Sequence, residues 1–269
     1  MRGARACHDD GPGYAPGLFS PAAVAPRFFV DSTLAAGTSV ALPADVAHHA
    51  VRVLRLRSGA PLALFNGRGG EYPATLHVDG ASARAQIEGF DPVERESPLA
   101  LALVQALVAA DKLDWIVEKA IELGVERILV VPMQRSVVRL DAQRSARRLQ
   151  HWREIARAAC AQCGRNRVPA VDFCADFAAA VAAMPSDQTR LLMHPAAAYG
   201  LPAIPPGRGI ALLVGPEGGL ADAELQQAEA AGFIATQLGP RILRTETAGL
   251  AALAALQAMS GDFAAARCR

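Results

Sequence analysis

The spacing of apolar and polar positions divides the chain into two unlike parts. From residue 27 to about residue 90, short apolar stretches alternate with polar positions and turn residues. Within residues 60–78 this alternation surrounds a glycine-rich turn at residues 66–70, a pattern typical of a β-hairpin. Residues 48–56 have the spacing of a short helix that leads into a strand. We therefore expect the first part to form a small, β-rich, barrel-like domain.

From residue 99 onward, apolar runs of strand length alternate with stretches of helical period. The runs that we interpret as strands are residues 99–107, 127–133, 189–195, 209–216 and 233–240. The predicted helices are residues 111–124, 145–164, 221–232 and 245–259. Strands that alternate with helices are typical of a mostly parallel α/β sheet, which binds ligands at the carboxyl ends of its strands.

The stretch between the two parts, residues 91–98, is charged and contains two prolines, so we interpret it as a linker. We place the N-terminal domain at residues 26–92 and the C-terminal domain at residues 98–264. Residues 1–25 are rich in Gly, Ala and Pro and show no periodicity. We expect them to be a disordered extension that the fold does not need.

Composition and charge argue against only a few classes of protein, namely secreted and membrane-spanning ones. The chain has 269 residues, of which 52% are hydrophobic, and a net charge of +1, which gives no overall sign of a nucleic-acid partner. Its first residues lack the apolar segment of a secretory signal, so its five cysteines are expected to be reduced thiols. The longest apolar run, residues 99–110, is too short to span a bilayer. We expect a cytoplasmic protein with no membrane partner.

Cys160 and Cys163 form a single CxxC pair, which alone is a weak signal for a metal or redox site. No second pair follows, and His194 is distant in the sequence. We interpret the pair as two small residues at the end of an alanine-rich helix and expect no metal.

The stretch GPEGG, residues 215–219, follows a predicted strand and is the first candidate for a binding loop. A nucleotide phosphate loop needs GxxxxGK[ST], whereas Glu217 here would repel a phosphate. Glycines at this point favour a close backbone approach to a cofactor that is neutral or positive, and S-adenosylmethionine is such a cofactor. The alternative is that GPEGG only turns a strand into a helix.

A second turn of the same kind, residues 238–248, favours the cofactor over that alternative. It ends a predicted strand, presents Arg241 and Arg244, and then starts a helix with Thr245 as the expected N-cap and Glu246 in the first turn. Two such strand-end loops, one helix apart, are expected to face each other and to enclose a flat ring through backbone donors and acceptors.

These two turns together resemble the C-terminal signature of the SPOUT methyltransferases, and more narrowly that of the 16S ribosomal RNA uridine-N3 methyltransferases of the RsmE type. Other stretches agree in order: residues 27–30, 48–59, 64–72, 111–125, 135–141 and 163–169. The resemblance runs from Arg27 almost to the end of the chain. One departure is Ala221, which stands where relatives carry a Ser or Thr that caps the following helix.

The resemblance implies a PUA-like, RNA-binding N-terminal β-barrel domain and a C-terminal α/β SPOUT domain with a deep trefoil knot. It also implies a homodimer with S-adenosylmethionine bound near the dimer interface. The helix at 245–259, which is apolar around much of its circumference, also favours a dimer. The expected cofactor-binding residues are Leu213, Gly215, Pro216, Gly218, Gly219, Leu238, Gly239, Ile242, Leu243 and Thr245.

The reaction that the resemblance implies is methylation of N3 of a uridine in 16S rRNA, either free or in the assembled small ribosomal subunit. This atom carries a proton that must leave, so a general base or a positive group beside the ring is expected. We assign the second role to Arg244. For Glu217 we favour binding of the cofactor ammonium group over the role of base. His194 is another candidate base. The alternative is that His194 is a structural residue held by hydrogen bonds.

The distribution of charge points to RNA more strongly than the net charge does. Residues 135–167 contain nine arginines and two acids, and such an excess favours phosphate binding over a mixed, solvated surface. We expect RNA contacts from Arg147 and Arg148, and from Arg165 and Asn166, which follow a helix-ending glycine. Arg52 and Arg55 in the first domain are further candidates, with solubility as the alternative.

Two other functions stay open at this point. The same class of fold includes ribose 2′-O-methyltransferases, although the motifs above favour base methylation. A protein that binds RNA without catalysis is the second alternative, and it is distinguished by an absence of S-adenosylmethionine binding.

Overall fold

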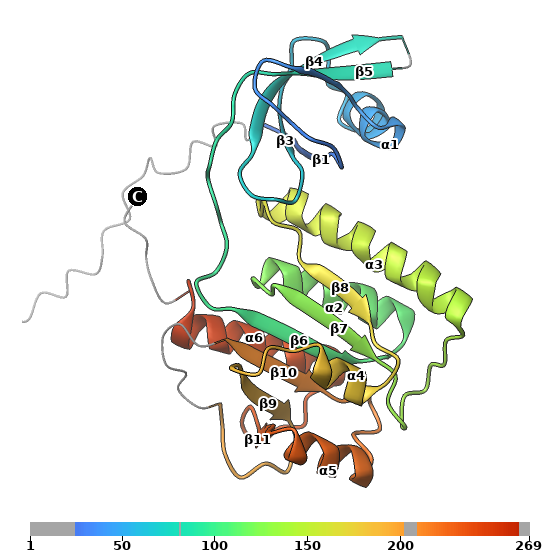
Figure 1. The fold of residues 1–269 in the computed structure, drawn as a ribbon, viewed down its shortest axis with the longest axis vertical. Coiled ribbons are helices and arrows are strands. Elements are labelled where there is room, and N and C mark those ends of the chain that lie inside the picture. The colour runs from blue at the N-terminus through green and yellow to red at the C-terminus, as the bar shows by residue number, and fades with distance from the viewer. Residues whose placement is uncertain (1–24, 81, 202–208, 264–269) are drawn as a thin grey trace, which may run out of the picture.

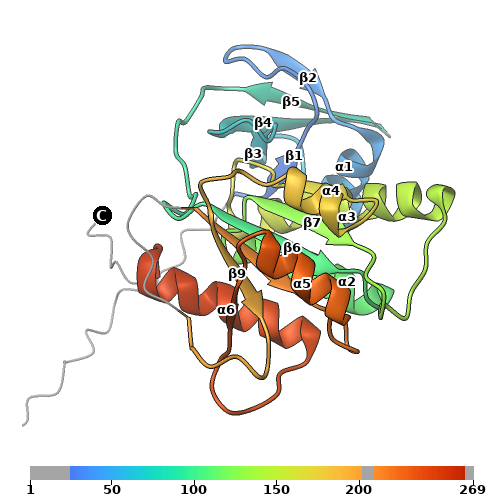
Figure 2. The ribbon, with the colours of Figure 1, turned by 60° about the horizontal axis from the view of Figure 1, so that its bottom comes forward.

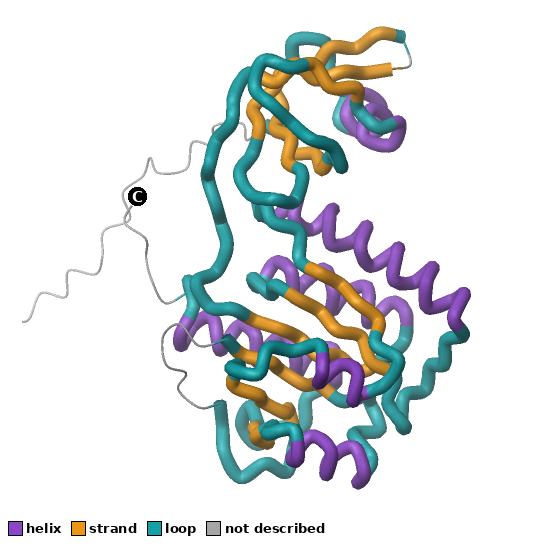
Figure 3. Tube along the Cα trace, viewed as in Figure 1, coloured by secondary structure: helices purple, strands orange, loops and turns teal. Residues whose placement is uncertain are grey.

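The computed structural model describes residues 25–80, 82–201 and 209–263. The expected extension lies almost wholly outside these residues. The described chain forms two sheets, a smaller N-terminal one and a larger C-terminal one, joined by an extended stretch that runs along one side of the molecule (Figures 1 and 3).

The N-terminal sheet has five strands in the order β1-β3-β4-β5-β2. Their bounds are β1 (Arg27–Phe29), β2 (Ser39–Ala41), β3 (Pro61–Phe65), β4 (Tyr72–Asp79) and β5 (Ser82–Ile87). The predicted hairpin is confirmed, because β3 and β4 pair antiparallel with Leu64 opposite Tyr72. The helix expected within residues 48–56 is present as the π-helical turn η1 (His49–Val53), which continues helix α1 (Ala44–His48) from residues before the expected start. The residues after it do not continue into a strand until Pro61.

The C-terminal sheet is fully parallel, with six strands in the order β11-β9-β10-β6-β7-β8. Their bounds are β6 (Leu101–Ala106), β7 (Arg127–Val131), β8 (Ala170–Phe173), β9 (Thr189–Met193), β10 (Ile210–Val214) and β11 (Ile234–Thr236). The five strands expected from the apolar runs are all present. The sixth, β8, was missed because it has only four residues and includes Asp172.

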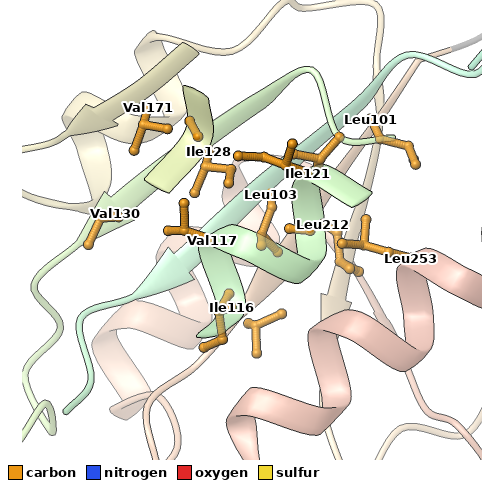
Figure 4. Packing of buried hydrophobic residues seen from close by; sticks show 14 of the residues in the cluster. Leu101, Leu103, Ile116, Val117, Ile121, Ile128, Val130, Val171, Leu212 and Leu253 are labelled. Carbon is orange, nitrogen blue, oxygen red and sulfur yellow. The ribbon is translucent and has the colours of Figure 1, made fainter. Parts of the chain in front are cut away.

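Helices cover both faces of this sheet, as Figures 1 and 2 show. One face packs against α2 (Ala110–Glu122), α3 (Ala142–Cys163) and α6 (Thr245–Ser260), and the other against α4 (Phe177–Ala182) and α5 (Asp222–Ala230). Successive side chains of a strand point to opposite faces, so Leu103 and Leu212 join the first core and Val104 and Leu213 the second. Figure 4 shows the first core, where Ile116 and Leu253 approach the sheet from two helices.

Two helix starts differ from the sequence expectation. Arg244, and not Thr245, occupies the N-cap position of α6, and Thr245 is the first helical residue. At α5, Ala221 has no capping side chain, but Glu224 accepts a hydrogen bond from the Ala221 backbone N–H at 2.9 Å. This single bond satisfies one of the free donors at the helix start, which limits the cost of losing a Ser or Thr.

Candidate functional site

A pocket of about 710 Å³ lies where three neighbouring strands end. It is lined by the loops after β9, β10 and β11, which are adjacent in the sheet order, and by Lys112 and Arg135 from the segments after β6 and β7. Parallel strands bring their carboxyl ends to one edge, so these loops meet there. The volume is in the range typical of small-molecule sites.

The pocket brings together nearly all of the residues expected to bind a cofactor. Its lining includes Gly215, Pro216, Gly218, Gly219, Leu238, Gly239, Ile242, Leu243 and Thr245, together with Glu217 and Arg244. Leu213 is the exception. Its side chain is fully buried in the core beneath α4 and α5, on the sheet face away from α6, so it supports the loop from below instead of lining the pocket.

Thr245 joins the two glycine loops directly. Its hydroxyl donates a hydrogen bond to the carbonyl of Gly215 at 2.7 Å and accepts one from the Gln105 side-chain amide at 3.1 Å. Gln105 is fully buried at the end of β6. The Thr245 hydroxyl and the Gln105 amide are both buried, so losing either hydrogen bond would leave a buried polar group unpaired. The two bonds therefore hold the loops in place. The role of Gln105 was missed in the sequence, although a single Gln in an apolar strand is the signal that marks it.

The two glycines after Glu217 serve different purposes. A Cβ on Gly218 would lie 3.2 Å from the Arg135 Cβ, which is closer than ordinary packing. Gly219 has open space around it but a φ of +71°, which L-residues rarely adopt. The Arg135 guanidinium also donates to the Gly218 carbonyl at 3.2 Å. The loop is thus held close to the segment after β7.

Glu217 has a partner that the sequence did not reveal. The Lys112 ammonium group lies 3.0 Å from a Glu217 carboxylate oxygen and 3.5 Å from one of Glu246. The hydrogen bond to Glu217 raises the pKa of Lys112 above its usual value. Because the Lys112 ammonium group already occupies a Glu217 carboxylate oxygen, Glu217 is placed to hold charge at the pocket wall.

Unlike Lys112, Arg241 and Arg244 have no carboxylate partner among the described residues. Both side chains are exposed at the pocket. The Ile242 side chain between them is 84% exposed. Within the described part of the chain, the backbone N–H groups of Gly239, Ile242 and Leu243 make no hydrogen bond. This loop therefore offers free backbone donors and two free guanidinium groups.

His194 lies on the pocket wall, held by its neighbours. Its backbone N–H donates to the Thr236 carbonyl at 2.9 Å, and its Nδ1 accepts from the Ala196 N–H at 3.3 Å. That arrangement leaves Nε2 as the atom available to a ligand, so both roles considered from the sequence remain compatible with its position.

The CxxC pair lies in the last turn of α3. Cys160 is buried, and burial raises the pKa of its thiol to about 12. Burial also raises the pKa of Cys163. No cluster of His, Cys, Asp or Glu that suits a metal occurs in the part of the chain that the structure describes. None of the helices among those residues is long and apolar enough to cross a membrane.

The arginines expected to bind RNA fall into three groups. Arg147 on α3 and Arg52 and Arg55 on the N-terminal domain are exposed and make no ion pair among the described residues. Arg148 is half-buried, 3.9 Å from Asp114. Arg55 also has a φ of 56°, the only positive φ of a non-glycine residue in the described part.

Arg165 and Asn166 form the third group, and their expected exposure to RNA is wrong. The two residues are only 4% and 0% exposed and lie between the two domains. The reason is the short path from α3 to β8, which carries them inward under the linker and not onto the surface.

The excess of positive charge counted along residues 135–167 is largely balanced in the folded chain by nearby carboxylates. Six of the nine arginines have a carboxylate within 4 Å, and these are Arg144, Arg148, Arg153, Arg157, Arg165 and Arg167. Most of the partners, such as Glu94, Glu96 and Asp114, come from elsewhere in the sequence. A count within one window of sequence cannot include them.

Two family models match the chain. The model described as an RNA methyltransferase domain matches residues 95–257, and the model described as an RNA methyltransferase PUA domain matches residues 42–88. These matches, with the parallel sheet and the separate small sheet, confirm the expected α/β fold class with a PUA-like N-terminal domain. The trefoil knot stays a prediction.

Curated relatives agree with these models. The chain is 31% identical to ribosomal RNA small subunit methyltransferase E of Mycobacterium tuberculosis over 261 residues, which cover 91% of this chain and 97% of the relative. The protein of the same name from Buchnera aphidicola is 29% identical over 241 residues, covering 88% and 95%.

Solved structures are similar along the same length. Ribosomal RNA small subunit methyltransferase E from Neisseria gonorrhoeae, bound to S-adenosyl methionine, is 42% identical with a TM-score of 0.82, covering 89% of this chain and 99% of that one. A Legionella pneumophila methyltransferase in complex with the same cofactor is 34% identical with a TM-score of 0.83, covering 88% and 99%.

Proposed function

The chain belongs to the ribosomal RNA small subunit methyltransferase E family of RNA methyltransferases, and on that premise we propose that it methylates N3 of a uridine in 16S rRNA. The protein is thus an S-adenosylmethionine-dependent rRNA methyltransferase, and the uridine and its N3 atom are the finer part of the proposal. The observation that carries it is the pocket between the two glycine loops, because this pocket gathers the family's signature residues at one sheet edge.

The pocket fits S-adenosylmethionine in size and in chemistry. When bound, this cofactor supplies an electrophilic methyl group on a positively charged sulfur. The free backbone N–H groups of Gly239, Ile242 and Leu243 suit the acceptors of a planar base. Gly218 and Gly219 leave the backbone accessible to the cofactor. Glu217, although it pairs with Lys112, adds negative charge to a wall that must accept a cation.

Arg244 is the catalytic residue of the proposal. Uridine N3 must pass its proton to water before or while it bonds to the methyl carbon. Negative charge develops on N3 and the ring oxygens as the proton leaves, and the bond to the methyl carbon removes it. The Arg244 guanidinium is at the pocket, exposed and without a carboxylate partner among the described residues, so it is free to stabilise that negative charge. A preorganised cation of this kind acts mainly in the transition state. The uridine has to leave its base stack to reach it.

The RNA is expected to lie over the face that carries the pocket and α3. Arg147 on α3, with Arg52 and Arg55 on the N-terminal domain, gives exposed positive charge for the phosphate backbone. The small ribosomal subunit or its free 16S rRNA is the proposed substrate, and the cytoplasm is the proposed place of action. The homodimer and the knotted C-terminal chain belong to the same proposal.

Base methylation has one rival on the same kind of fold, transfer to the ribose 2′-O. The deciding experiment incubates the protein and S-adenosylmethionine with small subunits from cells that lack this enzyme, digests the rRNA to nucleosides, and identifies the product by mass spectrometry. The proposal expects 3-methyluridine. A methyl group on the ribose would contradict the N3 assignment while leaving the methyltransferase assignment intact.

The other rival, an RNA-binding factor without catalysis, predicts no methylated nucleoside in the same digest. A variant that replaces Arg244 with Ala serves as the internal control, since any contaminating methyltransferase would act equally in both samples.

A further inference from the structure

The segment of residues 163–169, between α3 and β8, is packed against three parts of the chain that precede the C-terminal sheet. Arg165 makes the deepest of these contacts. Its Nε lies 3.2 and 3.1 Å from the two carboxylate oxygens of Glu96 in the linker, and its Nη2 also donates to Glu96. Its Nη1 donates to the carbonyls of Ile121 and Val125 at 2.9 and 2.8 Å.

Asn166 extends the same contact into the N-terminal domain. Its side-chain amide donates to the Val93 carbonyl at 2.7 Å, and its Oδ1 accepts from Arg27 Nη2 at 2.6 Å. Its backbone carbonyl accepts from the Gly69 N–H at 3.2 Å. Arg27 is in β1, Val93 in the linker and Gly69 in the β3–β4 turn. One fully buried side chain and its backbone thus connect three separate segments of the first domain and the linker.

The glycine-rich β3–β4 turn is shaped for this contact. A Cβ on Gly69, whose φ is +103°, would lie 2.7 Å from Arg167 Nη2 and would also meet the Glu94 carboxylate. A Cβ on Gly67 would lie 3.1 Å from Val168 Cγ2. Residues Arg68 and Arg167 form a β-bridge at the same place. Glycines in this turn therefore allow the two domains to approach closely, in addition to closing the hairpin.

We propose that Arg165 and Asn166 are positioning residues, which dock the RNA-binding domain on the methyltransferase domain in one fixed orientation. Domains joined by a short, polar linker move relative to each other unless their interface holds them. A buried guanidinium paired with its carboxylate, and a buried amide hydrogen-bonded at both its nitrogen and its oxygen, favour this one arrangement, since any other leaves them unpaired. Docking gives the exposed arginines of both domains a constant spacing.

The consequence for RNA is simultaneous contact from both domains. Two linked binding surfaces gain affinity only when the geometry allows both to bind at once. In this respect the inference rests on the proposed function. Loss of docking is expected to weaken binding of the small subunit without changing the cofactor pocket, which α2 reaches with Lys112 at its opposite end.

The experiment compares the full-length protein with Asn166→Ala and with Gly69→Val, which places a side chain between the domains. Gly80→Val is the matched control, because Gly80 also has a positive φ, +57°, in the same domain, but nothing lies within 4 Å of its Cβ position. Small-angle scattering reports the domain arrangement, calorimetry the affinity for S-adenosylmethionine, and steady-state methylation the KM for small subunits.

Docking predicts that Asn166→Ala and Gly69→Val scatter with a larger radius of gyration, keep wild-type cofactor affinity, and raise the subunit KM by about tenfold with little change in kcat. Gly80→Val should match the wild type in all three. In the Asn166→Ala protein, a further Arg52→Ala and Arg55→Ala should add little to KM, because those arginines no longer act together with the pocket.

Wild-type scattering and KM in both variants would overturn the proposal. So would a loss of cofactor affinity in them, because the segment would then support the fold of the C-terminal domain and not the docking. If the wild type makes no 3-methyluridine, the proposed function fails, yet the scattering comparison still decides whether the domains are docked.

Discussion

Arg244 occupies the position where a single side chain has the most effect on the proposed chemistry. Its charge has no carboxylate partner among the described residues, and uracil acquires negative charge only as its proton leaves. Arg244→Ala is therefore expected to keep most of the affinity for S-adenosylmethionine while single-turnover methylation at saturating RNA falls by about 10²-fold or more. A near wild-type rate would refute this role. Loss of cofactor binding would instead make Arg244 part of the cofactor site.

At the same scale, the sequence identified most of the pocket but not what holds it in place. Glycines and the free arginines stand out because their types are unusual at strand ends. The contacts of Lys112 and Gln105 cannot be inferred in this way, because their partners Glu217 and Thr245 are more than a hundred positions away in the sequence. Thr245 was expected to cap its own helix, yet its hydroxyl binds the other loop. Local rules fail where a tertiary partner competes for the same group.

At the scale of single elements, helix α3 carries the clearest test of RNA binding. Arg147 is exposed and has no ion-pair partner among the described residues, whereas Arg153 on the same helix lies 3.3 Å from Asp172. Replacing Arg147 with Ala is expected to weaken RNA binding. In a plot of the logarithm of the binding constant against the logarithm of the salt concentration, the slope should become less steep by about one. Arg153→Ala is the matched control, with a smaller change. Equal slopes for Arg147→Ala and the wild type would remove α3 from the RNA surface.

Elements with long apolar or periodic patterns were predicted correctly, whereas two short elements were missed. Strands β6, β7, β9 and β10 each contain at least three consecutive apolar residues, so they stand out in the sequence. Strand β8 and helix α4 have four and six residues and were missed. β8 pairs only with β7, at the end of the sheet, so its position depends on that neighbour more than on its own pattern.

For the whole molecule, α6 supports the prediction of a homodimer. Its buried side includes Ala252, Leu253 and Leu256, while Leu250 is half-buried and Met259 is 49% exposed. An apolar helix that is not fully covered favours a partner of the same kind. Sedimentation at micromolar concentration is expected to give a mass near twice that of one chain. A stable monomer under those conditions would contradict this prediction.

The change of pattern near residue 99 predicts two parts, and the structure has two separate sheets, but the contact between them was not predicted. Arg165 and Asn166 follow a helix-ending glycine and look like exposed loop residues. Their burial depends on the linker and on the β3–β4 turn, which lie about 70 to 100 positions earlier in the sequence. Only the folded chain brings these segments together, so no local pattern in residues 163–169 predicts the interface.

The central claim is that the loops at residues 215–219 and 238–245 together form the S-adenosylmethionine site. Isothermal calorimetry of the cofactor, with the wild type and with Gly218→Val, tests it most directly. We expect one cofactor per chain for the wild type. We expect no detectable binding for the variant, whose added side chain would press on Arg135 at the loop. The comparison requires that the variant keep a cooperative thermal transition. Equal binding by the two proteins, or no binding by the wild type, would contradict the claim.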